Sequence, residues 1–113
     1  SIPENYLPDI NVRLLMYNKV SLAESSIDLK NIQIEMINRF GLLPEELKNF
    51  FLQAELRIIA EEYSIKKINF LDSKINISFK NKDLDTSFFN DDTLEEKIKM
   101  TSDVIKTICA NAP

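Results

Sequence analysis

The chain has 113 residues, of which 44% are hydrophobic, and its 18 acidic against 14 basic residues give a formal net charge of −4. This length suits one ordinary domain, and the negative charge disfavours direct binding to nucleic acid phosphates. The sequence has no histidine, one glycine and one cysteine. These counts exclude a histidine-based catalytic triad, an ordinary zinc site and a glycine-rich phosphate-binding loop. We therefore expect no catalytic residue, no cofactor and no metal.

The cellular setting is predicted from the same counts. No apolar run has the length of a membrane span, and no basic-then-apolar leader opens the chain. Cys109 has no partner for an internal disulfide, which is typical of a reducing compartment, and we expect it to be a small buried hydrophobe. The sequence begins at Ser1 rather than Met. We expect a cytoplasmic protein, excised or processed from something longer, without membrane contact.

The first part of the chain has the apolar spacing of two helices. Asp9 is a suitable cap for a helix from Ile10 to Ala23. A second helix starts at Ser25 or Ser26 and ends at Gly41. The stripe that we expect to face inward in the first helix is Ile10, Leu14, Tyr17 and Val20, widened by Leu15, Met16 and Leu22. In the second helix it is Leu29, Ile32, Met36 and Phe40, with Ile34 and Ile37 beside it.

The stretch NRFGLLPEEL predicts a helix stop followed at once by a helix start. Gly41, the only glycine, can take the left-handed conformation, with positive φ, that closes a helix at its C′ position. Pro44 suits the first turn of the next helix. Glu45 and Glu46 favour the positive end of that helix dipole. The third helix runs from Pro44 to about Tyr63, with an apolar face of Leu47, Phe50, Phe51, Ala54 and Ile58.

After Ser64 the apolar period changes to two, which predicts strands. Ile68 and Phe70 form one alternating run, and Ile75, Ile77 and Phe79 form another, with Asp72-Ser73 as the hairpin turn. The segment NKDLDTSFFNDD has no regular pattern, so Leu84, Phe88 and Phe89 are not assigned to an element.

A capping box then opens the last predicted helix. Thr93 and Glu96 have the T-x-x-E spacing. The inward face of this helix is Leu94, Ile98, Thr101, Ile105 and Ile108. We predict one α+β domain over residues 1–113, with three N-terminal helices, a β-hairpin or small antiparallel sheet, and a C-terminal helix.

Two motifs resemble the C-terminal domain of the bacterial transcription-repair coupling factor. That family tends to read proline-aspartate-(apolar)-asparagine near its start, and here Pro8 to Asn11 match it. Its second pattern is acid-(apolar)-(apolar)-acid-arginine-phenylalanine-glycine-leucine-(apolar)-proline, matched by Glu35 to Pro44 except that Asn38 replaces the second acid. The resemblance covers about the first two-thirds of the chain and fades beyond Phe70.

The resemblance implies a regulatory module of a large protein. The parent family is similar to an ATP-dependent DNA translocase that displaces stalled RNA polymerase and recruits nucleotide excision repair. Its C-terminal domain is not the motor. It folds back on an N-terminal module and covers the surface that binds the damage-recognition ATPase. This implies an intramolecular partner for the chain, with the ATPase and RNA polymerase as indirect partners.

The resemblance also points to docking residues. The acid pair of the family motif, thought to face arginines on the N-terminal module, maps onto Glu35 and Asn38, which share a helix face. The alternative is that Glu35 is an ordinary solvated residue. Arg39 can donate to a partner carboxylate or simply favour the negative end of the helix dipole. The exposed side of the Ile68–Phe79 hairpin is the alternative docking face.

Other charged pairs favour ordinary surface roles. Glu61 and Glu62 are adjacent on a helix and so point in different directions, which disfavours acid-base chemistry. Lys66-Lys67 and Lys80-Asn81-Lys82 are short basic spots typical of solvated strand ends. Besides the autoinhibitory domain, a free-standing adaptor in an unrelated protein interaction remains an alternative. A long reading frame with helicase motifs upstream of Ser1 would distinguish the first from the second.

Overall fold

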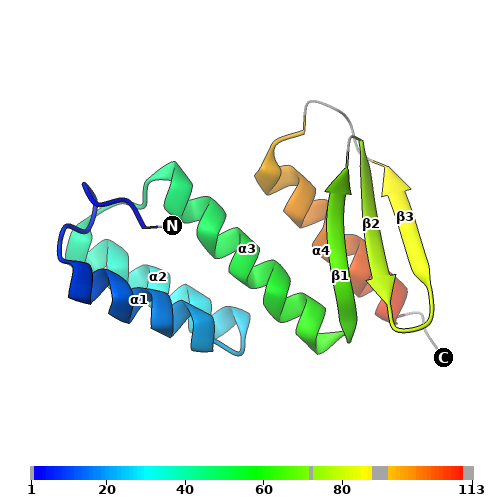
Figure 1. Cartoon of the computed structure of the whole chain (residues 1–113), viewed down its shortest axis with the longest axis horizontal. Coiled ribbons are helices and arrows are strands. Elements are labelled where there is room, and N and C mark those ends of the chain that lie inside the picture. Colours follow the sequence, from blue (N-terminus) through cyan, green and yellow to red (C-terminus); the bar gives the residue numbers. More distant parts are fainter. Residues whose placement is uncertain (1, 72, 88–91, 111–113) are drawn as a thin grey trace. The chain divides into compact units, whose positions relative to one another are not determined.

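The computed structural model describes residues 2–71, 73–87 and 92–110, which form four helices and one three-stranded antiparallel sheet. This is the predicted α+β class in the predicted order, helices first, then the sheet, then a closing helix (Figure 1). By its internal contacts the chain divides into two compact units, Ser1–Ile58 and Ile59–Pro113. Whether they unfold together as the single predicted domain stays a prediction.

The first unit contains the helices that the capping signals predict. Helix α1 spans Ile10–Leu22, and the side chain of Asp9 accepts hydrogen bonds from the first-turn amides. Helix α2 spans Ser26–Phe40 and is capped by Ser25. These two helices lie side by side (Figure 1). Helix α3, Glu45–Glu62, follows directly after Pro44 and carries the two predicted glutamates in its first turn.

The core of the first unit confirms the predicted faces of α2 and α3 but only part of that of α1. Met16 and Val20 are buried and Tyr17 packs against the core as predicted, while Ile10 is 60% and Leu14 is 56% exposed. The prediction was wrong for these two because apolar residues lie all round this helix, so that its spacing fits more than one inward face. The core of this unit comprises Ile2, Leu7, Met16, Val20, Ala23, Leu29, Met36, Leu47, Phe51, Ala54 and Ile58.

The second unit holds the sheet, in the order β1-β2-β3. Strands β1 (Ile65–Leu71) and β2 (Lys74–Phe79) form the predicted antiparallel hairpin, although Asp72 of its predicted turn lies outside the described residues. Strand β3, Asp83–Ser87, was not predicted and includes Leu84. Phe88 and Phe89 also lie outside the described residues.

Helix α4, Leu94–Ala110, packs on the apolar face of the sheet (Figure 1). The predicted capping box is present, because the Glu96 backbone amide donates to the Thr93 hydroxyl at 3.1 Å and the Thr93 amide donates to the Glu96 carboxylate at 3.2 Å. Ile105 of α4 is fully buried with Ile75 and Ile77 of β2. Cys109 is half-buried against this core rather than buried within it.

Candidate docking surface

The turn between α2 and α3 has the positive φ that was predicted for Gly41, but not the predicted left-handed conformation. Gly41 follows the last residue of α2 with φ +97° and ψ −172°, and its amide donates to the Ile37 carbonyl at 3.0 Å. The φ is positive as predicted, but ψ places the residue in an extended region that is essentially restricted to glycine, not in the left-handed helical region. The backbone at Gly41 thereby turns away from the axis of α2.

Tyr6 stabilises this turn from the N-terminal segment. Its hydroxyl lies 2.8 Å from the Gly41 carbonyl and 3.2 Å from the Met36 carbonyl, and it can donate to either. Its ring packs edge-on against Phe40 with 6.1 Å between the ring centroids. Burial raises the pKa of the Tyr6 hydroxyl. The end of α2 is therefore held by side-chain contacts as well as by its own cap.

Glu35 takes part in an ion-pair cluster with Lys19 and Arg39. The Lys19 ammonium lies 2.9 Å from Oε1 and 3.2 Å from Oε2 of Glu35, which joins α1 to α2. The Arg39 guanidinium, one turn further along α2, donates to Oε2 at 2.9 Å. Hydrogen bonds from Lys19 first, and then from Arg39, lower the pKa of the Glu35 carboxyl. Glu35 is thus ionised at neutral pH and bound on both of its oxygens.

The three sequence-predicted docking residues have different environments. Asn38 is exposed on α2. The Arg39 side chain is 46% exposed and its guanidinium carbon lies 4.8 Å from the centroid of the Phe40 ring. Glu35 is a third exposed, so it is neither a fully solvated residue nor one with a free carboxylate. Sequence reasoning missed Lys19, because nothing local to α1 shows a partner 16 positions away.

Exposed apolar side chains concentrate on the same two helices. Of the nine large hydrophobic residues that are exposed in the described part of the chain, four lie on α1 and three on α2. They are Ile10, Leu14, Leu15, Leu22, Ile27, Ile34 and Ile37, with Leu42 and Leu71 elsewhere. Contiguous exposed apolar area commonly marks a protein interaction site. The α1–α2 pair is therefore the strongest candidate surface.

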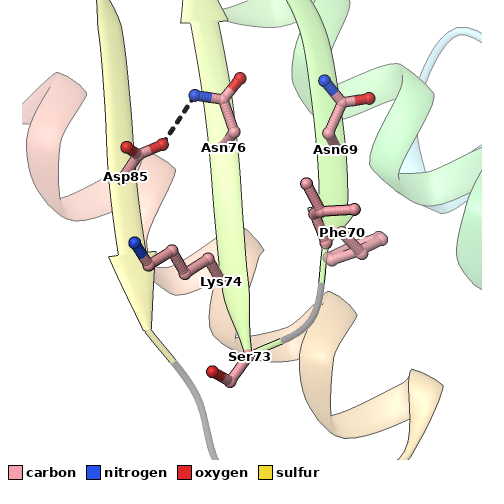
Figure 2. A pocket seen from close by; sticks show the side chains of 7 residues that line it. Asn69, Phe70, Ser73, Lys74, Asn76 and Asp85 are labelled. Carbon is pink, nitrogen blue, oxygen red and sulfur yellow. Dashed lines mark hydrogen bonds between the residues drawn. The ribbon is translucent and has the colours of Figure 1, made fainter.

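The alternative docking face, the outer side of the sheet, is hollowed and combines polar with apolar side chains. Asn69, Asn76 and Asp85 occupy matching positions on the three strands, and they form a row across the sheet in Figure 2. Asn76 donates to the Asp85 carboxylate at 2.7 Å. Together with Phe70, Leu71, Ser73 and Lys74 they line a hollow of about 650 Å³. Its one carboxylate is bound to an amide, so the hollow offers no pair of groups for acid-base chemistry.

The remaining charged pairs from the sequence analysis do not form a catalytic or metal-binding cluster in the described residues. Within residues 2–71, 73–87 and 92–110, no group of His, Cys, Asp or Glu side chains is arranged to hold a metal ion. Glu61 and Glu62 are both exposed near the end of α3, as are Lys66 and Lys67 on β1. No helix of the described part combines the length and the apolar character that crossing a bilayer requires.

Comparison with known proteins decides the family. Residues 1–88 match the family described as TRCF domain. The chain belongs to this family. The TRCF match covers all of the first unit, with the candidate docking surface, and the three strands of the second.

Curated relatives of this TRCF domain are far longer than the chain itself. It is 40% identical over 68 residues to the transcription-repair-coupling factor of Haemophilus influenzae, covering 60% of the chain and 6% of that protein. It is 34% identical over 80 residues to the factor of Borreliella burgdorferi, covering 71% of the chain and 7% of that protein. The chain therefore spans only a small part of these relatives.

A solved structure shares the fold over nearly the whole length. The crystal structure of the C-terminal domain of a transcription-repair coupling factor superposes with a TM-score of 0.81, covering 99% of this chain and 89% of that one, at 16% sequence identity. At this identity the likeness concerns the fold alone. It extends over α4, beyond the residues that the family match includes.

Proposed function

We propose that this TRCF domain is the autoinhibitory domain of a transcription-repair coupling factor and carries out no catalysis itself. The parent is an ATP-dependent DNA translocase of the cytoplasm that displaces stalled RNA polymerase and recruits nucleotide excision repair. The domain docks on the N-terminal module of the same protein and masks the surface that binds the damage-recognition ATPase. Family membership and the small share of the relatives' length that the chain covers support this proposal.

The exposed apolar surface of α1 and α2 is the observation that carries the proposal. Leu22 is 78% and Ile27 is 71% exposed, and Leu15 and Ile34 are each about half exposed. Covering such side chains removes apolar area from water, which is worth about 25 cal/mol per Å². A masking domain needs a face of this kind, and we assign the docking role to it together with Glu35, Asn38 and Arg39.

Deleting the domain from the full-length parent tests the masking role. We expect the parent without residues 1–113 to bind the damage-recognition ATPase more tightly than the intact parent does. If the intact and the truncated parent bind the ATPase equally well, the masking role is refuted and the adaptor alternative is favoured. The length of the reading frame upstream of Ser1 separates these two possibilities independently.

A pair of matched point variants locates the docking face. Leu15→Gln with Ile34→Gln places amides on the α1–α2 surface. Leu71→Gln instead changes one leucine of β1 that is more exposed, at 69%, than either of these two. Loss of about 1 kcal/mol of apolar burial opens the closed state roughly fivefold. We expect the first variant to raise ATPase binding and the Leu71 variant to leave it unchanged. The reverse result would move the docking face to the outer side of the sheet.

A further inference from the structure

Two short basic spots that are separate in the sequence meet at one end of the sheet. Lys66 and Lys67 lie at the start of β1, and Lys80 and Lys82 belong to the turn between β2 and β3. The first residue of β1 lies opposite the last residue of β2, so the start of β1 is beside this turn (Figure 1). Neighbouring strands are about 5 Å apart. Each spot alone is an ordinary strand end, but together the four residues form what we call the lysine patch.

The local backbone leaves all four side chains in contact with solvent. Strict alternation along β1 would direct Lys66 and Lys67 to opposite faces of the sheet. The register with β2 shifts at this point, and a bulge of this kind changes the direction of a side chain. In the turn, the Phe79 amide donates to the Lys82 carbonyl at 2.8 Å. All four lysines of the patch are exposed, including Lys80.

The ammonium groups of the patch have no acidic partner among the residues that the structure describes. None of the four lysines takes part in the ion pairs found there. The Lys82 nitrogen lies 5.9 Å from the centroid of the Phe79 ring, which is an aromatic contact and leaves its charge unpaired. Each ammonium has three hydrogen-bond donors. The patch therefore has donors available for the acceptors of a partner.

Acidic residues near the patch reduce its charge without cancelling it. Those nearest along the chain and across the sheet are Glu61, Glu62, Asp83 and Asp85. Glu61 interacts with a group outside the patch, and Asp85 is bound to Asn76 and lines the hollow with Lys74. Glu62 and Asp83 are exposed beside the patch, which leaves an excess of two positive charges. On α4, the exposed Asp103 and Lys106 add one charge of each sign.

These surroundings suit a short run of carboxylates better than a nucleic acid backbone. Residues 59–113 contain ten acidic and eight basic residues, and none of the basic ones is arginine, the preferred residue for phosphate recognition. A long polyanion that follows the sheet from the patch would meet Asp83 and Asp85 on β3. A short acidic segment needs only the patch itself. The half-buried Tyr63 and Phe79 are next to it and offer apolar contact.

We propose that the lysine patch binds an acidic segment of a partner protein, whose carboxylates accept hydrogen bonds from the four lysines. This is a second interaction surface, on the second unit, and it does not depend on the masking role of the α1–α2 surface. A single exposed ion pair contributes little, so binding requires several carboxylates at once. Its affinity should fall as salt is added, because the charges are exposed.

Two variants of equal net charge test whether the position of the lysines matters. The patch variant is K66Q/K67Q/K80Q/K82Q. The control variant removes four lysines that are exposed on helices, K30Q/K48Q/K99Q/K106Q. Urea melts establish that both chains retain the fold. Fluorescence anisotropy then measures the affinity of each chain for fluorescein-labelled hexaglutamate, and for a labelled DNA duplex at the same salt.

We expect the patch variant to bind hexaglutamate about tenfold more weakly than the unchanged chain, and the control variant at most about twofold more weakly. Equal weakening in both variants would mean that only the overall charge matters. Tighter binding of the duplex than of hexaglutamate, lost in the patch variant, would assign the patch to nucleic acid. Either result overturns the inference, and so does an unchanged chain that does not bind hexaglutamate.

The two halves of the patch are tested separately with K66Q/K67Q and K80Q/K82Q. Each should weaken hexaglutamate binding about threefold, because carboxylates of one segment contact both spots. A loss confined to one half would show that the two spots do not act together, which also overturns the inference.

Discussion

Gly41→Ala tests whether the α2–α3 turn depends on a backbone conformation that only glycine adopts easily. An added Cβ at Gly41 would meet no atom within 4 Å, so the substitution introduces no steric clash with the rest of the protein. The cost arises from φ +97° with ψ −172°, a region that carries about 1–3 kcal/mol of strain for other residues. Alanine offsets part of this cost by restricting the unfolded chain, by about 0.4–1 kcal/mol.

The net expected loss is about 1–2 kcal/mol of the free energy of unfolding of the first unit. In a urea melt this lowers the midpoint by roughly 0.5–1 M for a protein of this size. Gly41→Asn should cost about as much, because asparagine tolerates the left-handed helical region but not this extended one. D-Alanine, introduced by chemical synthesis, should cost little, since φ +97° and ψ −172° mirror an ordinary β conformation.

Leu42→Ala is the matched control, because Leu42 is 86% exposed beside the same turn. Its urea midpoint should equal that of the unchanged protein. Unchanged midpoints for both Gly41→Ala and Gly41→Asn would refute the reasoning, and so would an asparagine variant markedly more stable than the alanine variant. The second result would show that the turn uses the left-handed helical region.

Further predictions concern single groups. Tyr6→Phe removes a hydroxyl that can donate to two carbonyls and should lower the free energy of unfolding by about 1 kcal/mol. Because the pKa of Tyr6 is raised from 10.0, the unchanged protein should also lose stability as pH rises above about 10. The phenylalanine variant should not show this loss when melts are compared across pH. Glu35→Gln should lower the free energy of unfolding by about 0.5–1 kcal/mol at pH 7, measured by urea melts. Since the pKa of the Glu35 carboxyl is lowered from 4.5, the difference in stability between the two proteins should vanish as pH falls below that value. Ser64→Gly should stabilise the second unit by about 1 kcal/mol, measured by thermal melting, because Ser64 has φ +56°. The purified chain should neither hydrolyse ATP nor bind duplex DNA at physiological salt, measured by phosphate release and fluorescence anisotropy.

Local signals in the sequence accounted for most of the element boundaries. Asp9 and Thr93 cap the helices that they were predicted to cap, and Ser25 is the cap of α2, whose start was predicted at Ser25 or Ser26. Such caps depend on contacts between residues within one helical turn, so they can be predicted from the local sequence alone. Strand β3 has only Leu84 as a large apolar residue, and it is specified by its register with β2, which no local pattern of DLDTS reveals.

The surface features were harder to predict, because they depend on tertiary packing. Four of the apolar residues of α1 that were expected to contribute to its inward face are exposed, namely Ile10, Leu14, Leu15 and Leu22. The pairing of Lys19 with Glu35 follows from the antiparallel placement of α1 beside α2, which spacing along either helix cannot show. The family resemblance pointed to Glu35, Asn38 and Arg39 as docking residues. It did not show that the Glu35 carboxylate is bound to Lys19 and Arg39.

Competition between the chain and the damage-recognition ATPase is the most direct test of the central claim. The 113-residue chain is titrated into a complex of that ATPase with the parent from which these residues have been deleted, and the ATPase released is measured. If the chain docks on the N-terminal module and masks the binding surface, release should be saturable, and the Leu15→Gln, Ile34→Gln variant should require more chain for the same effect. A chain that binds the truncated parent while the ATPase stays bound would contradict the account.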